Sequence, residues 1–144
     1  MKRRSGYTLI EAMIVLAIVT IVSMMAIPNF QKWVYHLNYN GFIRDVFTEF
    51  RHARERALAT GIAHTVDVDT VNNKVRLRAS DNSYVRKEEI KAPGGSDILS
   101  GSSVTFNSDG SASSNGDVRI VNLHSSADNQ AIVVTLGTGR VKIQ

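Results

Sequence analysis

Residues 7–28 read YTLIEAMIVLAIVTIVSMMAIP, an almost wholly apolar stretch whose only charged side chain is Glu11. As an α-helix, the residues before Pro28 rise about 31 Å, which matches the roughly 30 Å hydrocarbon core of a bilayer. A secretory signal peptide has a shorter apolar core that ends at a small-residue cleavage site, and this stretch has neither property. The three basic residues at positions 2–4 favour a cytoplasmic N-terminus. The sequence therefore predicts one membrane span, with everything after Pro28 outside.

Glu11 is the residue that sets this span apart from an ordinary anchor. An isolated carboxylate in lipid is costly unless it has a partner. A single acid on a single span provides no proton relay, so that role is rejected. A simple single-pass anchor explains neither Glu11 nor the glycine at position 6. The function of the segment therefore depends on what Glu11 pairs with.

The segment Gly6-Tyr7-Thr8-Leu9-Ile10-Glu11 resembles the processing site of type IV prepilins and type II secretion pseudopilins, where Gly-Phe-Thr-Leu-Ile-Glu is usual. The resemblance implies that a prepilin peptidase cuts after Gly6 and methylates the new amine of Tyr7, which stands in place of the usual Phe. It also implies that Glu11 pairs with the N-terminal amine of a neighbouring subunit. Pro28 falls where the family places its helix kink.

A second helical pattern follows Pro28. Apolar residues recur at spacings of three and four from Ile43 to Ala57, which predicts a helix with one apolar face. Gly61 is suited to end this helix, because glycine adopts the left-handed conformation easily. We expect a bend near Pro28 and a possible further break at 38–41, where the sequence is Asn-Tyr-Asn-Gly.

From Ile62 onward the apolar residues follow a period of two, which is typical of strands. A turn at 70–73 predicts a hairpin, and further strands are predicted at 104–107, 118–124, 131–136 and 140–143. The stretches 93–103 and 108–116 are rich in turn-forming residues and are predicted to be loops. The predicted fold class is α+β: a long N-terminal helix packed on a C-terminal, mostly antiparallel β-sheet domain.

Together with the resemblance to prepilins, these patterns divide the chain into four expected parts. They are a leader at 1–6, a membrane and filament-core helix at 7–28, an amphipathic helix half at 29–61 and a periplasmic β-rich domain at 62–144. The formal charge of +4 comes mainly from the leader, since the rest of the chain has 14 basic against 13 acidic residues. No global basic field remains to indicate nucleic acid. The chain has no cysteine, so the domain must be held by packing rather than disulfides.

Three short C-terminal patterns resemble FimT/GspH-type minor pseudopilins. They are the helix end at 50–57, the turn at 104–110 and the Gly-Arg strand at 137–141. The resemblance implies a type IV pilin-like fold and a minor subunit that primes or caps a type IV pilus or a type II secretion pseudopilus. Its implied partners are other pilins or pseudopilins, a prepilin peptidase, an inner-membrane assembly platform, and membrane lipid before assembly. The sequence leaves the choice between pilus and secretion system open.

A second hypothesis is a DNA-binding pilus-tip protein for natural transformation, a role that the resemblance to FimT-type proteins also implies. Lys74, Arg76 and Arg78 fall on one face of a predicted strand and would contact phosphates without sequence preference. The alternative interpretation is a solvated strand face, because acidic residues nearby dilute the patch. A groove that joined this stripe to Arg119, Arg140 and Lys142 would favour DNA binding over a solvated strand face.

The sequence contains little that indicates an enzyme. Its four histidines are scattered, it lacks cysteine, and it has no nucleophile motif. The oxygen-rich stretch around Asp109 does not have the spacing of a calcium loop and is better explained by turn chemistry. We therefore predict no catalytic residues, no metal site and no cofactor.

Overall fold

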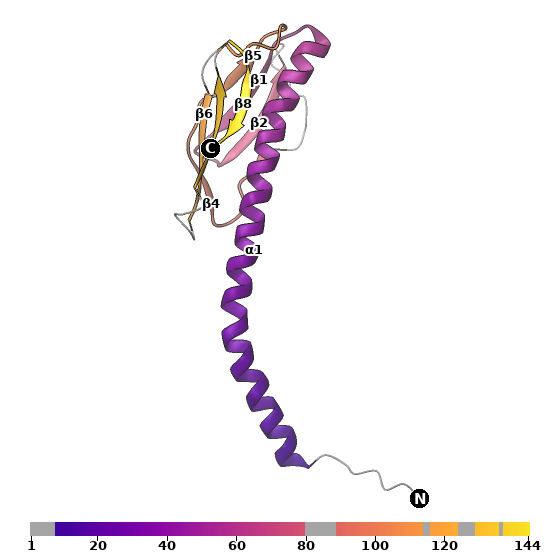
Figure 1. Ribbon diagram of the computed structural model, residues 1–144, viewed down its shortest axis with the longest axis vertical. Coiled ribbons are helices and arrows are strands. Elements are labelled where there is room, and N and C mark those ends of the chain that lie inside the picture. The colour runs from indigo at the N-terminus through magenta and orange to yellow at the C-terminus, as the bar shows by residue number, and fades with distance from the viewer. Residues whose placement is uncertain (1–7, 80–88, 114–115, 124–128, 136) are drawn as a thin grey trace, which may run out of the picture. The chain divides into compact units, whose positions relative to one another are not determined.

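Figure 1 shows the computed structural model of the chain, which describes residues 8–79, 89–113, 116–123, 129–135 and 137–144. One helix is followed by strands: α1 (Leu9–Thr60), β1 (His64–Asp69), β2 (Lys74–Ala79), β3 (Ile90–Lys91), β4 (Ser96–Ser100), β5 (Val104–Phe106), β6 (Gly116–Asn122), β7 (Gln130–Thr135) and β8 (Arg140–Ile143). The chain forms two compact units, Met1–Val34 and Tyr35–Gln144.

Helix α1 ends at Thr60, as predicted, and Gly61 takes a left-handed φ of 69°. The break considered at 38–41 does not occur, because the helix continues through these residues. Local turn propensity is weak and tertiary packing overrides it. Tyr39 is fully buried here, and its hydroxyl donates to the carbonyl of Ile120 at 3.0 Å and accepts from the N–H of Gln130 at 3.0 Å. This anchoring of Tyr39 holds the segment helical.

The strands form two four-stranded sheets rather than the one sheet predicted. Their orders are β3-β2-β1-β5 and β4-β6-β7-β8, and every described pairing is antiparallel. The prediction of a loop over 93–103 is wrong, because this stretch contains β4. Ile98 is buried in the core, and β4 pairs with β6 through a register irregularity near Ser100. Serine-rich composition hid this strand, whose pairing is decided by the neighbouring strand.

The other strand predictions hold to within two residues. The hairpin of β1 and β2 has its turn at 70–73, and β8 covers the predicted 140–143. Strand β6 starts at Gly116, two residues before the prediction and inside the predicted loop at 108–116. Residue 136, at the end of the predicted strand 131–136, lies outside the described residues.

A single core joins the C-terminal part of α1 to both sheets (Figure 1). The apolar helix face predicted from Ile43 to Ala57 is buried, and Phe50 at its centre is fully inaccessible. The inward-facing side chains of each sheet complete the cluster, as the periods of 3.6 and two require. They are Val66, Val75, Leu77, Val104 and Phe106 from one sheet, and Ile98, Val118, Ile120, Ile132 and Val134 from the other.

Candidate functional site

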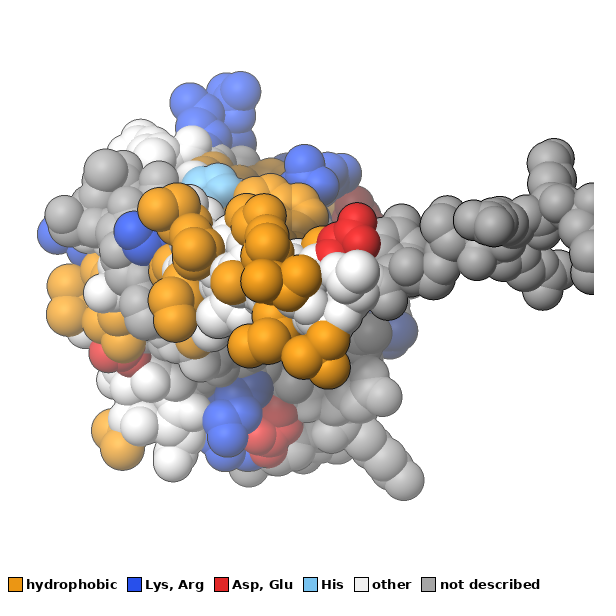
Figure 2. Space-filling model, turned by 90° about the horizontal axis from the view of Figure 1, so that it is seen from below, with side chains coloured by type: hydrophobic (Ala, Val, Ile, Leu, Met, Phe, Trp, Pro, Cys, Tyr) orange, Lys and Arg blue, Asp and Glu red, His pale blue; other side chains and the backbone are white. Residues whose placement is uncertain are grey.

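The N-terminal part of α1 is apolar on every side. All large apolar side chains from Leu9 to Trp33 are exposed, with accessible fractions from 52% at Val15 to 82% at Leu9. Figure 2 shows apolar side chains exposed at the molecular surface. Among the described residues, α1 is the one helix long and apolar enough to cross a membrane, with a mean hydropathy of 2.5 over its most apolar stretch. Such a helix needs lipid or other helices around it.

Three polar side chains inside this apolar segment form hydrogen bonds within the helix. Each donates to the backbone carbonyl four residues earlier: Thr20 to Leu16 at 2.8 Å, Ser23 to Val19 at 2.7 Å and Asn29 to Met25 at 3.3 Å. The helix continues through Pro28. Because proline has no N–H, the carbonyl of Met24 lacks its usual helical donor, and Pro28 marks the weak point of the segment.

Glu11 lies in the first turn of α1, where a negative charge suits the helix dipole. Its backbone N–H donates to the hydroxyl of Thr8 at 3.3 Å, so Thr8 caps the helix. This cap is a feature that our sequence reasoning missed, although Thr8-x-x-Glu11 is a recognisable capping-box pattern. The Glu11 side chain is exposed. Gly6 and Tyr7 lie outside the described residues.

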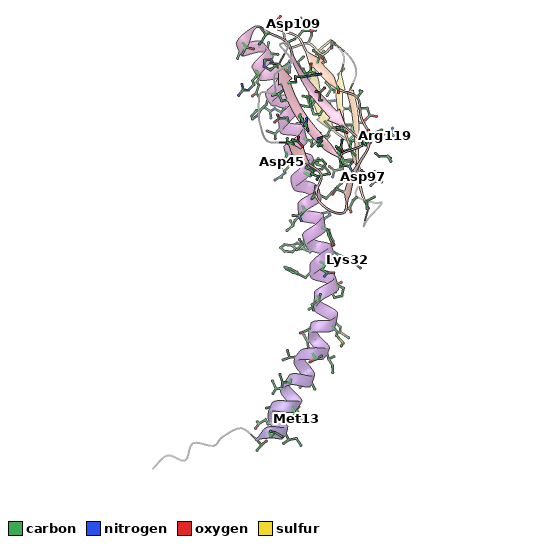
Figure 3. All side chains as sticks on the ribbon, turned by 180° about the vertical axis from the view of Figure 1, so that it is seen from behind. Met13, Lys32, Asp45, Asp97, Asp109 and Arg119 are labelled. Carbon is green, nitrogen blue, oxygen red and sulfur yellow. The ribbon has the colours of Figure 1, made fainter. Side chains whose placement is uncertain are left out.

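Glu11 has no nearby base in the described part of the first unit. Between Thr8 and Val34 the other charged residue is Lys32, which lies 21 positions further along the helix. At 1.5 Å per residue the two are about 31 Å apart. Figure 3 shows Met13, close to Glu11 in sequence, and Lys32 at well-separated points on the helix. A positive partner for Glu11 must therefore come from the chain's own N-terminal residues or from another molecule.

The basic stripe of β2 exists as predicted, but acids accompany it. Lys74, Arg76 and Arg78 share one face, because the alternate residues of the strand are buried. Arg78 pairs with Asp67 at 3.0 Å, and Lys74 lies 3.4 Å from Glu89, which also pairs with Arg76. The contact with Asp67 could have been predicted from the alternating pattern of β1 and β2. Antiparallel pairing places Asp67 opposite Arg76 and diagonal to Arg78.

The bases that would have extended this stripe lie in the other sheet. Lys74, Arg76 and Arg78 belong to β2, whereas Arg119 is on β6 and both Arg140 and Lys142 are on β8. Figure 3 shows Arg119 near Asp97, on the strands of the second sheet. The cleft beside β2 is lined by Asp67, Val68, Asp69, Thr70, Arg76 and Ser103, so it contains none of the three other bases. The two clefts beside β8 are likewise lined by no residue of β2, so none of these three clefts joins the two sets.

The three C-terminal patterns singled out in the sequence meet at one junction. At the helix end, the Arg54 Nε donates to the carbonyl of Gly110 at 3.1 Å. Gly139, in the turn before β8, lies so close that an added Cβ would be 2.3 Å from the same carbonyl oxygen. Leu58 covers Gly110 from the helix side, and Gly110 and Gly139 both have a positive φ. These patterns therefore specify a packing junction.

Asp109 confirms that the oxygen-rich stretch around it is a turn, and Asp69 makes similar contacts in another turn. Asp109 accepts from the hydroxyl of Ser111 at 2.6 Å and from its N–H at 2.8 Å, and these bonds lower the Asp109 pKa. In the β1–β2 turn, the Asn72 side chain donates to Asp69 at 2.8 Å and lowers the Asp69 pKa in the same way. Among the described residues, no three His, Cys, Asp or Glu side chains are grouped to hold a metal ion.

Comparison with known proteins agrees with these observations. Residues 1–27 match the model of the prokaryotic N-terminal methylation motif. The fold is similar to that of the type IV minor pilin FimU of Pseudomonas aeruginosa, with a TM-score of 0.62 and 10% identity over 78% of this chain and 92% of that chain. It is also similar to the minor pseudopilin EpsH from the type 2 secretion system of Vibrio cholerae, with a TM-score of 0.57 and 10% identity over 70% of this chain and 91% of that chain.

No curated protein matches the chain significantly by sequence. At 10% identity the structural likeness establishes the fold, and it confirms the predicted α+β, type IV pilin-like class. The chain thus combines an N-terminal methylation motif with the fold of minor pilins and pseudopilins.

Proposed function

We propose that this protein is a structural subunit of an extracytoplasmic filament: a minor pilin of a type IV pilus or a minor pseudopilin of a type II secretion system. One observation carries the proposal. The methylation motif at 1–27 leads into an exposed apolar helix, and that helix continues into a pilin-like fold. Filament assembly uses both features, because subunits wait in the membrane before their helices bundle.

In this proposal a prepilin peptidase removes residues 1–6 after Gly6 and methylates the amine of Tyr7. The apolar helix then anchors the protein in the inner membrane, with the β-rich domain in the periplasm. An assembly platform in that membrane transfers the subunit into a filament. Leaving lipid for a helix bundle gains little from water exclusion, so close packing and polar pairs supply the specificity. The lost backbone bond at Pro28 provides a point at which the helix can adjust.

Glu11 is the polar group that we assign to docking. Its side chain is exposed, and the described residues near it contain no base. A positive N-terminal amine on a neighbouring subunit would neutralise the carboxylate and fix the register of docking. The Thr8 cap holds the first helical turn from which Glu11 projects.

The finer role that we propose is priming or capping of the filament, with other pilins or pseudopilins as direct neighbours. The likeness to FimU and EpsH, both minor subunits, supports it. The DNA-binding alternative has weaker support. Lys74, Arg76 and Arg78 contact carboxylates, and a phosphate would have to displace Asp67 or Glu89 from them.

Two variants test the proposal. Changing Gly6 to Leu should leave the leader uncut. Mass spectrometry should then find a protein that retains residues 1–6 and has no methyl group on Tyr7. Changing Glu11 to Ala should leave processing intact but prevent entry into filaments, measured by mass spectrometry of sheared filaments. Asp117→Ala is the control, because Asp117 is an exposed acid that pairs only weakly with Arg119 at 3.4 Å. Normal incorporation of the Glu11 variant would refute the role of its carboxylate.

In-cell crosslinking from the second sheet, followed by identification of the partners, would then separate the two machines. Recovery of pilus subunits assigns the protein to a pilus, and recovery of pseudopilins assigns it to a secretion system. If no filament subunit is recovered, the proposed function is wrong.

A further inference from the structure

We propose that the outer edge of β8 and the cleft between β8 and α1 form a docking site for an acidic, extended segment of another protein, which would add to the second sheet as a further strand. We call this site the β8 groove. It is distinct from Glu11 and the apolar helix, and the inference holds whichever filament the protein belongs to.

The first observation is that β8 offers unused backbone groups. Ala131 and Gln144 exchange both backbone hydrogen bonds, at 2.9 and 2.8 Å, across the β7–β8 pair. Because such pairs alternate in an antiparallel ladder, the N–H and C=O groups of Val141 and Ile143 point away from β7. No strand in the part of the chain that the structure describes pairs with this outer edge. A free edge of this kind is a template for an added strand.

The second observation is that open space runs beside this edge. Near the start of β8, a cleft of about 290 Å³ is lined by Phe47, Arg51 and Leu58 of α1 and by Gly139, Arg140 and Val141. Near its end, a cleft of about 450 Å³ is lined by Leu37, Gly41 and Arg44 of α1 and by Gln130 and Ile143. The two clefts lie along the same strand and the same helix, so they follow the path that an added strand would take.

The third observation is the charge of the lining. The described side chains around the two clefts include four arginines, Arg44, Arg51, Arg54 and Arg140, but a single acid, Glu55. Arg54 is engaged at the Gly110 carbonyl, and Arg51 lies in an exposed, weak pair with Glu55. Charge complementarity therefore favours an acidic occupant.

The groove suits a polypeptide better than a nucleic acid. Leu58 and Leu37 are 52% and 48% exposed and lie on the helix wall of the clefts, where apolar side chains of an added strand would pack. The edge groups of Val141 and Ile143 require a partner that both donates and accepts at strand spacing, and phosphate only accepts. The described lining contains one aromatic side chain, Phe47, so it gives little platform for base stacking.

The test uses the full chain in detergent micelles and a fluorescent peptide of alternating Val and Glu, with binding followed by anisotropy. We expect binding that is lost when Lys replaces Glu in the peptide. The variant Arg51→Glu/Arg140→Glu should weaken it about tenfold or more, as loss of two charge contacts implies. Arg119→Glu is the matched control, since Arg119 is exposed on the same sheet but lines neither cleft, and it should change affinity little.

Strand addition itself is tested on the peptide, which leaves the protein unchanged. Two forms of the peptide are made, each methylated at the backbone nitrogens along one of its two edges. The form methylated along the edge that faces β8 loses its hydrogen-bond donors and should no longer bind, whereas the other form should still bind. Equal binding of both methylated forms, or no binding of the parent peptide, would overturn the proposal. Displacement of the peptide by a short DNA duplex that itself binds with an affinity dependent on Arg51 and Arg140 would also overturn it, in favour of a general polyanion site.

Discussion

Replacing Gly139 with Ala should destabilise the C-terminal domain far more than the same change at Gly137, two residues earlier in the same turn. Both glycines have a left-handed φ, of 59° and 76°. They differ in their surroundings. A Cβ at Gly137 would meet nothing within 4 Å, whereas one at Gly139 would be 2.3 Å from the Gly110 carbonyl oxygen and 3.3 Å from the Arg54 Nε. Gly137→Ala therefore measures the conformational cost alone.

The expected magnitudes follow from these contacts. The left-handed conformation costs an alanine about 1–2 kcal/mol, and this cost applies to both variants. At Gly139 the backbone must also move to relieve the clash with a carbonyl oxygen, which costs about 1–3 kcal/mol. The displaced Gly110 carbonyl then loses its hydrogen bond from Arg54, which contributes about 1 kcal/mol. We expect Gly139→Ala to cost about 2–4 kcal/mol more than Gly137→Ala.

The assay is urea unfolding of the full chain in detergent micelles, followed by circular dichroism, with the free energy of unfolding compared between the two variants. Arg54→Ala should reproduce part of the effect and should add little to Gly139→Ala, because both changes break the same contact. Equal destabilisation by Gly137→Ala and Gly139→Ala would refute the reasoning, since it would mean that the turn does not press against Gly110.

Three further outcomes follow from the same domain. Tyr39→Phe should lower the free energy of unfolding by about 2 kcal/mol in urea titrations, because two buried backbone partners lose the hydroxyl. Gly116→Ala should cost about 1–3 kcal/mol by the same measurement, because its Cβ would lie 2.2 Å from a β5 side chain. The lowered pKa values of Asp69 and Asp109 stabilise the fold above their unfolded value of 3.8. The free energy of unfolding should fall as the pH drops through the lowered pKa values of the folded state. The fall should be less steep in the double variant Asp69→Asn/Asp109→Asn.

The sequence predicted those elements whose periodicity covers a long stretch. The apolar run at 7–28 predicted the first part of α1, and the helix face from Ile43 to Ala57 predicted its last part. The β1–β2 hairpin followed from strict alternation around a turn of four residues. Strand β4 was missed because serine and aspartate outnumber its single buried apolar residue, Ile98, and its strand state depends on pairing with β6.

For the basic stripe, the sequence predicted the shared strand face but not the acidic partners of its three bases. Alternation correctly placed Lys74, Arg76 and Arg78 on one face of β2. It carried no information on which carboxylates would lie against them, because Asp67 and Glu89 meet the stripe through strand pairing and a return of the chain. Whether a cation is available to a ligand is thus a property of the folded surface.

The N-terminal features of this protein can be read directly from its residues: the motif at 1–27, the apolar length of the helix and the solitary Glu11. These are properties of consecutive residues, so no tertiary contact is needed to recognise them. Three other features become visible only in the folded chain: the division into two sheets, the junction of Arg54 with Gly110 and Gly139, and the open edge of β8 beside α1. Each of these depends on backbone groups brought together from distant parts of the chain. The periodicity of side chains along the sequence does not predict such contacts.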